Sequence, residues 1–303
     1  MTAASVKVIA PAKINLYLHV TGQRADGYHL LDSLVVFADV FDVITINPAS
    51  RFAFAIEGAY ASAFCAADRE SGPEGKNLVV QAAYACSRFF GKPLECRITL
   101  AKNMPLAAGI GGGSADAAAV VWGLIRYWDI KTPPLGTIMP LLLSLGADVP
   151  VCYLSHVAHV AGIGEVVSPR EDFPEWPAVL INPRQAVATP EIFTALHEQD
   201  FSYSKPSALP DDLSDPDEIL LFLQQQRNDL QPVTSARLPV ITQMIDQLAE
   251  MPGVQMARMS GSGATIFGLC RQQERAEEIA EEIQQRNPQW WVRSCLLNGV
   301  VRY

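Results

Sequence analysis

A glycine-rich stretch in the middle of the chain constrains the fold more than any other feature. Residues 105–118 read PLAAGIGGGSADAA, with four glycines among the five residues 109–113. Glycine accepts positive φ angles and leaves its N–H group unshielded, so such a run can wrap closely around an anion. After Ser114, apolar residues recur at helical spacing between 121 and 128. The stretch therefore predicts a phosphate-binding loop that ends at the N-terminus of a partly buried helix.

The two common phosphate loops do not match this stretch. A P-loop requires Lys and then Ser or Thr after its last glycine, whereas Ser114 and Ala115 follow here. A dinucleotide fingerprint beginning at Gly109 would need a glycine at position 114. A flexible loop or a glycine helix cap is the simpler alternative, but four glycines at the start of an amphipathic helix favour the phosphate loop.

The composition limits the class of protein. A chain of 303 residues is long enough for two domains with separate cores, and 49% hydrophobic with 18% charged residues suits a folded globular protein. The net charge of −9, without any Lys/Arg run, argues against a nucleic-acid partner. Six scattered cysteines without a C-x-x-C pair favour neither a zinc site nor a disulfide framework. No apolar segment is long enough to span a membrane, so we expect a cytoplasmic protein without a membrane partner.

An early strand contains the first candidate site residues. Residues 13–20 alternate strictly, which places Lys13, Asn15, Tyr17 and His19 together on the face opposite the core. A lysine at the start of a strand is most often a solvated edge residue. Taken alone, Lys13 would be interpreted in that way.

Three further candidates also have ordinary structural explanations. Asp148 lies two residues before Pro150, which is the arrangement of a helix N-cap, and the pattern alone favours a cap. Tyr28 and His29 stand at the exit of a polar loop. An aromatic ring beside a histidine can stack on a ligand ring and hydrogen-bond it, although packing against a neighbouring strand is commoner.

The rest of the chain alternates between predicted strands and helices. Expected strands cover residues 33–38, 42–47, 94–101, 157–167, 177–182, 254–259, 265–270 and 290–297, and expected helices cover 77–90, 137–145, 235–251 and 272–286. Asp215 is the expected cap of one more helix, with Pro216 in its first turn. A second Gly/Ser stretch, residues 260–264, separates two late strands. Both halves of the chain are therefore of the α+β class.

The order of three stretches resembles the GHMP kinase superfamily: residues 11–15 (PAKIN), 105–118 and 260–264 (SGSGA). Residues 24–29, 146–150 and 227–230 resemble those members that use ATP to phosphorylate cytidine diphosphate methylerythritol, giving the 2-phosphate and ADP in the non-mevalonate route to isoprenoids. The resemblance spans nearly the whole chain. It implies an α+β fold of two domains. Residues 1–160 would form an ATP-binding domain like ribosomal protein S5 domain 2, and residues 161–303 a ferredoxin-like domain on the substrate side.

The same resemblance implies roles for individual residues. Asp148 would be the base that faces the substrate hydroxyl, and Lys13 its cationic neighbour. The implied ATP-binding positions are Asn77, Leu78, Lys102, Pro105, Leu106, Ala107, Ala108, Gly109, Ile110, Gly111, Gly112, Gly113, Ser114 and Ala115. The implied substrate-binding positions are Asn15, Tyr28, His29, Thr189, Pro190 and Phe193, with two aromatic rings stacking on cytosine.

The resemblance leaves the metal and the adenosine contacts less defined. Phosphoryl transfer implies Mg²⁺, for which Ser114 is a candidate ligand, and no second carboxylate is assigned to it. Ala115 stands where the family often has a serine, and Asp116 stands where some members have an amide. Contacts near the adenosine are therefore expected to differ.

Two other functions stay open at this point. Another GHMP kinase, acting on mevalonate, homoserine or galactose, would share the glycine loop but should lack Gly27-Tyr28-His29. A non-catalytic nucleotide sensor would use the same scaffold, because a fold alone does not fix a function. A structural protein would leave the glycines without a purpose. We expect a small-molecule substrate and a monomer or weak homodimer.

Overall fold

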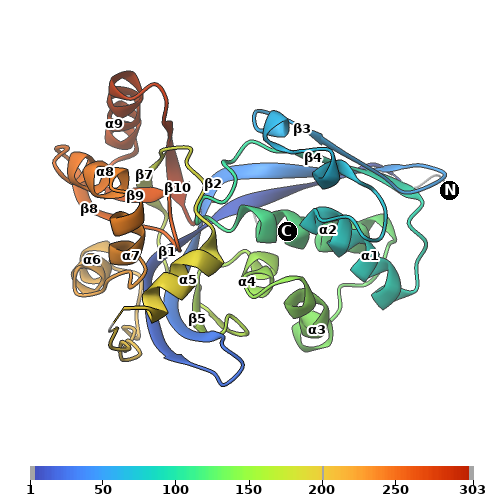
Figure 1. Ribbon diagram of the computed structural model, residues 1–303, viewed down its shortest axis with the longest axis horizontal. Coiled ribbons are helices and arrows are strands. Elements are labelled where there is room, and N and C mark those ends of the chain that lie inside the picture. Colours follow the sequence, from blue (N-terminus) through green and yellow to red (C-terminus); the bar gives the residue numbers. More distant parts are fainter. Residues whose placement is uncertain (1–3, 200, 300–303) are drawn as a thin grey trace.

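The computed structural model describes residues 4–199 and 201–299, and the fold is α+β, as expected (Figure 1). The strands of this part of the chain form one mixed ten-stranded sheet, with the order β3-β4-β2-β10-β7-β9-β8 along its main path. Strands β1 and β5 also pair with β2, and β6 pairs with β5. The outer ends of the two predicted domains, residues 1–3 and 300–303, lie outside the described residues.

A long antiparallel hairpin extends through both halves of the molecule (Figure 1). It consists of β1 (Val6–Gln23) and β2 (His29–Pro48), and β2 joins the two separate strands predicted at 33–38 and 42–47. The register shifts between Asn15 and Tyr17, as it does at a β-bulge. The prediction that one face carries Lys13, Asn15, Tyr17 and His19 is therefore wrong. Lys13 and Asn15 face the cavity described below, whereas Tyr17 packs edge-on against Phe222 in the core.

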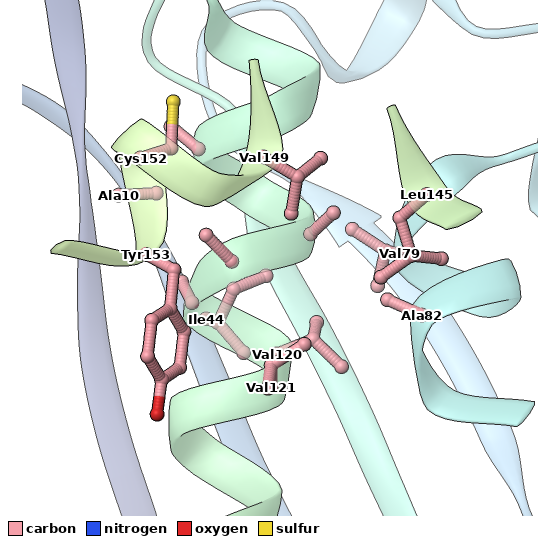
Figure 2. Packing of buried hydrophobic residues seen from close by; sticks show 14 of the residues in the cluster. Ala10, Ile44, Val79, Ala82, Val120, Val121, Leu145, Val149, Cys152 and Tyr153 are labelled. Atoms are coloured by element: carbon pink, nitrogen blue, oxygen red, sulfur yellow. The ribbon is translucent and has the colours of Figure 1, made fainter. Parts of the chain in front are cut away.

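In the first half, four helices cover one face of the sheet. They are α1 (Leu78–Phe90), α2 (Gly112–Tyr127), α3 (Leu135–Leu145) and α4 (Val149–Leu154), and the strands beside the hairpin are β3 (Ala53–Glu57) and β4 (Cys96–Ala101). Two short 3-10 helices, η1 (Ala61–Ala63) and η2 (Ala67–Arg69), follow β3. Helix α2 lies at the centre, where Val120 and Val121 pack among side chains from β2, α1 and α4 (Figure 2). At Gly123 a Cβ atom would lie 2.7 Å from Ile46 Cδ1, so glycine lets the helix approach the sheet closely.

The second half continues the same sheet and covers it with further helices. Its strands are β7 (Trp176–Asn182), β8 (Val254–Met259), β9 (Ile266–Cys270) and β10 (Trp291–Leu297), and its helices are α5 (Thr189–His197), α6 (Pro216–Gln224), α7 (Gln231–Arg237), α8 (Val240–Ala249) and α9 (Gln273–Arg286). Helix α5 lies between the two groups of helices in Figure 1. The capping prediction for α6 is confirmed, because the Asp215 side chain accepts hydrogen bonds from the N–H groups of Asp217 and Glu218.

Two predicted elements are each divided in the structure. The helix expected over 235–251 is α7 and α8, because Pro239 disfavours a helical conformation at Leu238, where φ is −133° and ψ is 82°. The strand expected over 157–167 is a hairpin of β5 (Ala158–Gly162) and β6 (Val166–Pro169), which adds to the edge of β2. The predicted domain boundary at 160 falls inside β5, and its position stays a prediction.

Candidate active site

A cavity of about 570 Å³ is lined by residues from both halves of the chain. The predicted site residues that line it are Lys13, Asn15, Asn77, Leu78, Lys102, Pro105, Leu106, Ala107, Ala108, Gly109, Gly111, Gly112, Gly113, Ser114, Asp148, Thr189, Pro190 and Phe193. Ile110, Ala115, Tyr28 and His29 are not among its lining residues. The side chains of Ile110 and Ala115 are buried in the core instead. The structure thus brings most of the predicted positions around one space.

The glycine loop has the backbone geometry of an anion cradle. Ala107, Gly109 and Gly111 have φ angles of 46°, 71° and 63°, so every second residue is left-handed. Helix α2 begins at Gly112, three residues earlier than the start predicted after Ser114, because Gly112 and Gly113 themselves belong to its first turn. The N–H groups of that turn have no acceptor inside the helix. They and the helix dipole therefore favour a negatively charged ligand at this end of the cavity.

The second Gly/Ser stretch, residues 260–264, supports the glycine loop from behind. Ser260 Oγ donates to the Gly109 carbonyl over 3.0 Å, and the Thr265 N–H donates to the Ala108 carbonyl over 3.0 Å. A Cβ atom at Gly109 would lie 2.5 Å from the Ser260 carbonyl oxygen and 2.6 Å from that of Gly263. Only glycine fits at position 109, because these neighbours are backbone atoms, which cannot move away by changing rotamer as a side chain could.

Lys13 and Asp148 form an ion pair at the cavity. Lys13 Nζ lies 2.8 Å from Asp148 Oδ1, and the lysine side chain is 6% exposed while the aspartate is 44% exposed. Asp148 occupies the N-cap position of α4, as the sequence pattern predicts, but its side chain makes no capping hydrogen bond and pairs with Lys13 instead. The Lys13 N–H donates to the Ile110 carbonyl over 2.9 Å, and a Cβ atom at Gly111 would lie 3.1 Å from Lys13 Cβ. The glycine loop therefore holds Lys13 in place through both its backbone and its side chain.

On the side of the cavity formed by α5, aromatic and polar groups come together. The ring of His29 stacks on Phe193 of α5, with centroids 4.8 Å apart and an interplanar angle of 24°. Tyr28 is 58% exposed. The pKa of His29 is lowered, mainly by burial and further by His197. The hydroxyls of Thr189 and Ser262 lie 2.8 Å apart in the same region.

Asn15, which lines the cavity, contains a buried acceptor without a partner. Its Nδ2 donates to Ser33 Oγ over 2.8 Å, and its Oδ1 is buried without a hydrogen-bond partner. Because a buried carbonyl oxygen without a donor is costly, this atom is suited to accept a hydrogen bond from a ligand hydroxyl or amino group.

Lys102 forms a buried cluster with two acidic residues, Asp42 and Asp116, which the sequence analysis did not predict. The Lys102 ammonium lies 2.5 Å from Asp42 Oδ2 and 2.6 Å from Asp116 Oδ2, and all three side chains are buried. Burial raises the pKa of Asp116 to about 7, although Lys102 opposes that shift. Burial alone would lower the pKa of Lys102, but attraction to Asp116 and Asp42 outweighs it, so the pKa is raised. The sequence signal was weak: Asp42 is a charged residue between Phe41 and Val43, but the same strand also contains Asp32 and Asp39.

The protein oxygens at the cavity fit a metal ion that arrives with a nucleotide. Among residues 4–199 and 201–299, no three His, Cys, Asp or Glu residues are grouped so that they could hold a metal ion. Mg²⁺ in kinase sites is usually held by one or two protein oxygens together with substrate phosphates and water. The Ser114 hydroxyl and the Asp148 carboxylate are among the oxygens that line the cavity and could serve that purpose.

No helix within the described residues has both the length and the apolar character needed to cross a membrane.

Comparisons with known proteins agree with this geometry. The sequence matches the family model described as the GHMP kinases N terminal domain over residues 77–156, and the one described as GHMP kinases C terminal over residues 208–289. These matches define the class as GHMP kinases. A homoserine kinase from Cytophaga hutchinsonii shares the fold, with a TM-score of 0.66, 17% identity and 97% and 95% of the two chains covered.

More similar relatives narrow the class. A 4-diphosphocytidyl-2-C-methyl-D-erythritol kinase from Cereibacter sphaeroides is 45% identical over 97% of this chain and 99% of its own. The corresponding protein from Roseobacter denitrificans is 44% identical over 97% and 94%. A crystal structure of 4-(cytidine 5'-diphospho)-2C-methyl-D-erythritol kinase matches with a TM-score of 0.76 and 29% identity over 97% of this chain and 100% of that one. The chain therefore belongs to the 4-diphosphocytidyl-2-C-methyl-D-erythritol kinase family.

Proposed function

We propose that the protein transfers the γ-phosphoryl group of ATP to a hydroxyl of 4-diphosphocytidyl-2-C-methyl-D-erythritol, giving the 2-phosphate and ADP. Family membership supports a small-molecule kinase of the non-mevalonate pathway. The observation that carries the proposal at the atomic level is the Lys13–Asp148 ion pair, 2.8 Å long, beside a glycine loop in a cavity lined by both halves.

In this proposal ATP lies along the glycine loop. Its phosphates accept hydrogen bonds from the N–H groups of Gly111 to Ser114, and its adenosine lies toward Asn77 and Leu78, which line the same cavity. Asn77 also caps α1, because its Oδ1 accepts from the Val79 N–H over 3.0 Å. This hydrogen bond fixes the Asn77 side chain before the nucleotide arrives.

The chemistry requires few groups, because phosphoryl transfer depends mainly on positioning and on neutralising charge. Asp148 accepts the proton of the substrate hydroxyl as its oxygen bonds to the γ-phosphorus, and the bond from that phosphorus to the β–γ bridging oxygen breaks to release ADP. Lys13 holds Asp148 in position and neutralises negative charge on the transferring group. Mg²⁺, with Ser114 as its protein ligand, would neutralise phosphate charge when bound.

The second substrate lies at the opposite end of the cavity. Phe193, stacked on His29, offers one face of an aromatic pair to the cytosine ring, and Tyr28 is exposed and free to cover its other face. Asn15 Oδ1 is placed to accept from a hydroxyl or amino group, and Thr189 and Pro190 line the path between the two ends.

We further expect the enzyme to be cytoplasmic, to act as a monomer or weak homodimer, and to have no nucleic-acid partner. The last of these expectations rests on the acidic composition and on the lack of any basic run, and the first on the scattered cysteines.

Turnover measurements test the proposal. The purified protein is given ATP and Mg²⁺ with the cytidine substrate, and in parallel reactions with mevalonate, homoserine or galactose, while ADP release is followed. We expect ADP release only with the cytidine substrate, and phosphorus NMR should detect a new phosphate monoester at the 2-position. ATP binding without turnover of any of the four would support a nucleotide sensor instead.

A further inference from the structure

Three buried charged side chains meet beneath the glycine loop, each from a different segment. Asp42 belongs to β2, Lys102 follows β4, and Asp116 lies in the second turn of α2. Their relative exposures are 0%, 2% and 3%. Burying charges is costly unless they are paired with good geometry, so this arrangement requires a specific packing of the three segments.

Asp42 fixes the segment that leads into the glycine loop. Its Oδ2 contacts Lys102 Nζ at 2.5 Å, and its Oδ1 accepts from the N–H groups of Asn103 and Met104 at 2.5 and 2.9 Å. One carboxylate thus binds three consecutive residues, and Pro105, the first residue of the loop, follows directly.

Lys102 connects this anchor to the other end of the loop. Its Nζ contacts Asp116 Oδ2 at 2.6 Å, and a Cβ atom at Gly112 would lie 3.1 Å from Nζ. The ammonium group therefore lies directly below the first residue of α2. Lys102 and Asp116 line the cavity, whereas Asp42 does not.

We infer that Asp42 is a positioning residue for the nucleotide: acting through Lys102, it fixes both ends of the glycine loop and so sets the affinity for ATP without touching it. Buried charge-assisted hydrogen bonds hold one arrangement of the chain, here through both oxygens of Asp42, the Lys102 ammonium and Asp116 Oδ2, while Asp116 Oδ1 has no partner. A cradle of N–H groups binds phosphate well only while its donors converge. The inference rests on the proposed function, because it requires ATP in this cavity.

The test is the Asp42→Asn variant, which keeps a carbonyl oxygen for the two N–H groups but removes the charge that holds Lys102. We expect the Kd for ATP, measured by titration calorimetry, to rise about ten-fold or more. The KM for ATP should rise similarly, while kcat and the KM for the cytidine substrate change by less than about two-fold. Asp42→Glu keeps the charge but displaces it by one methylene group, and it should also raise the Kd.

Asp172→Asn is the matched control. Asp172 also pairs with a cation, Arg170, at 2.7 Å and also accepts a backbone N–H, that of Leu213, at 2.7 Å, but it does not line the cavity. It should leave the Kd for ATP unchanged. In addition, the Asp42→Asn/Lys102→Met double variant should bind ATP no more weakly than Lys102→Met alone, because Asp42 acts through that lysine.

The outcomes separate the inference from the proposed function. If the wild-type protein does not bind ATP, the proposed function fails and the inference with it. If the wild-type protein binds ATP and folded Asp42→Asn and Asp42→Glu bind equally well, only the inference is overturned. Lower thermal stability with an unchanged Kd would likewise mean that Asp42 is merely structural.

Discussion

Lys13 would be interpreted from its local sequence as a solvated residue at the start of a strand, but in the structure it is a buried member of the candidate active site. Its strand lies under the glycine loop, so the side chain is buried instead of solvated, and the carboxylate of Asp148 is its ion-pair partner. Asp148 is 135 positions further along the chain (148 − 13), and local sequence contains no information on that distance. The pair forms because α4, whose N-terminus carries Asp148, packs against β1, which carries Lys13.

We predict that Asp148→Asn lowers kcat roughly 10²-fold or more, the scale of a positioned general base, with little change in fold or in ligand affinity. Lys13→Met should also lower kcat, and the double variant should be little worse than the poorer single variant, because the two residues act as a unit. Steady-state kinetics and thermal melts provide the measurements. Near wild-type turnover in Asp148→Asn would remove this aspartate from the mechanism.

Asp215→Asn is a suitable control, since Asp215 is an aspartate that does cap a helix, α6, and does not line the cavity. Asparagine caps as well as aspartate, so both stability and turnover should persist. Removing a capping side chain costs about 1 kcal/mol of folding stability. Asp148→Ala should not cause that loss, because the Asp148 side chain makes no capping hydrogen bond.

A second prediction concerns two glycines in first turns of helices. At Gly113 of α2 and at Gly136 of α3 an added Cβ atom would meet nothing within 4 Å, so alanine should fit both in the free protein. Gly113 lines the cavity and Gly136 does not. Gly113→Ala should therefore weaken ATP binding about ten-fold or more by placing a methyl group where phosphate lies, with no loss of stability, and Gly136→Ala should not.

Calorimetric titration with ATP and thermal unfolding of the two variants decide this point. Equal ATP affinity in Gly113→Ala and Gly136→Ala would exclude the loop as the phosphate cradle. Gly109→Ala is expected to differ from both and to unfold more easily. Its φ of 71° alone costs about 1–2 kcal/mol for alanine, and the Ser260 carbonyl would be in contact with the new methyl group.

At the scale of elements, the sequence predicted types and positions well where the pattern was local. The helix at 77–90 is α1, the strand at 177–182 is part of β7, and Asp215 caps α6 as its motif indicates. The errors arose where a backbone detail intervened. A β-bulge after Asn15 changes which side chains face the cavity, and Pro239 divides one predicted helix into two.

The site was predictable to the same degree. The glycine loop is visible as composition, whereas the roles of Lys13 and Asp148 came from resemblance to a family and not from their local patterns. Asp42 was missed because its partners, Lys102 and Asp116, are 60 and 74 residues away (102 − 42 and 116 − 42), and only the fold brings them together. Buried polar groups of this kind need long-range contacts to be recognised.

The aromatic stack between β2 and α5 leads to a third prediction. Stacking of a base on an aromatic side chain contributes about 1–3 kcal/mol, so Phe193→Ala should raise the KM for the cytidine substrate roughly ten-fold or more. The KM for ATP should barely change, because Phe193 belongs to α5 in the second half of the chain, whereas Asn77 and Leu78 stand at the start of α1 in the first half. Phe89→Ala, which removes a half-exposed ring of α1 outside the cavity, is the matched control.

A substrate analogue tests the same element from the ligand side. If His29 and its neighbours select the cytosine ring edge, the uridine analogue should be a poorer substrate. Equally efficient phosphorylation of the cytidine substrate and the uridine analogue would contradict base selection. The stacking prediction would still be tested separately by the kinetics of Phe193→Ala.

For the whole molecule, the β1–β2 hairpin is the element that all parts share. Strand β1 contributes Val8 and Ala10 to the core of the first half, Ile14 to a central cluster, and Leu18 and Val20 to the core of the second half. Hydrogen bonds from Ser260 and Thr265 to the glycine loop join the halves again at the site. Neither half can lose the hairpin and keep a closed core.

We therefore predict that the halves unfold in a single transition. Tryptophan fluorescence can follow each half separately, since Trp122 and Trp128 pack in the first half and Trp290 in the second. Variants that keep only the first pair or only Trp290, with phenylalanine at the other positions, should melt at the same temperature. ATP at 100 times its Kd should stabilise both signals by about 2.7 kcal/mol, because the site requires both halves. Two separate melting temperatures, of which only the first-half signal responds to ATP, would mean that the hairpin does not couple the cores and that residues 260–264 are dispensable for nucleotide binding.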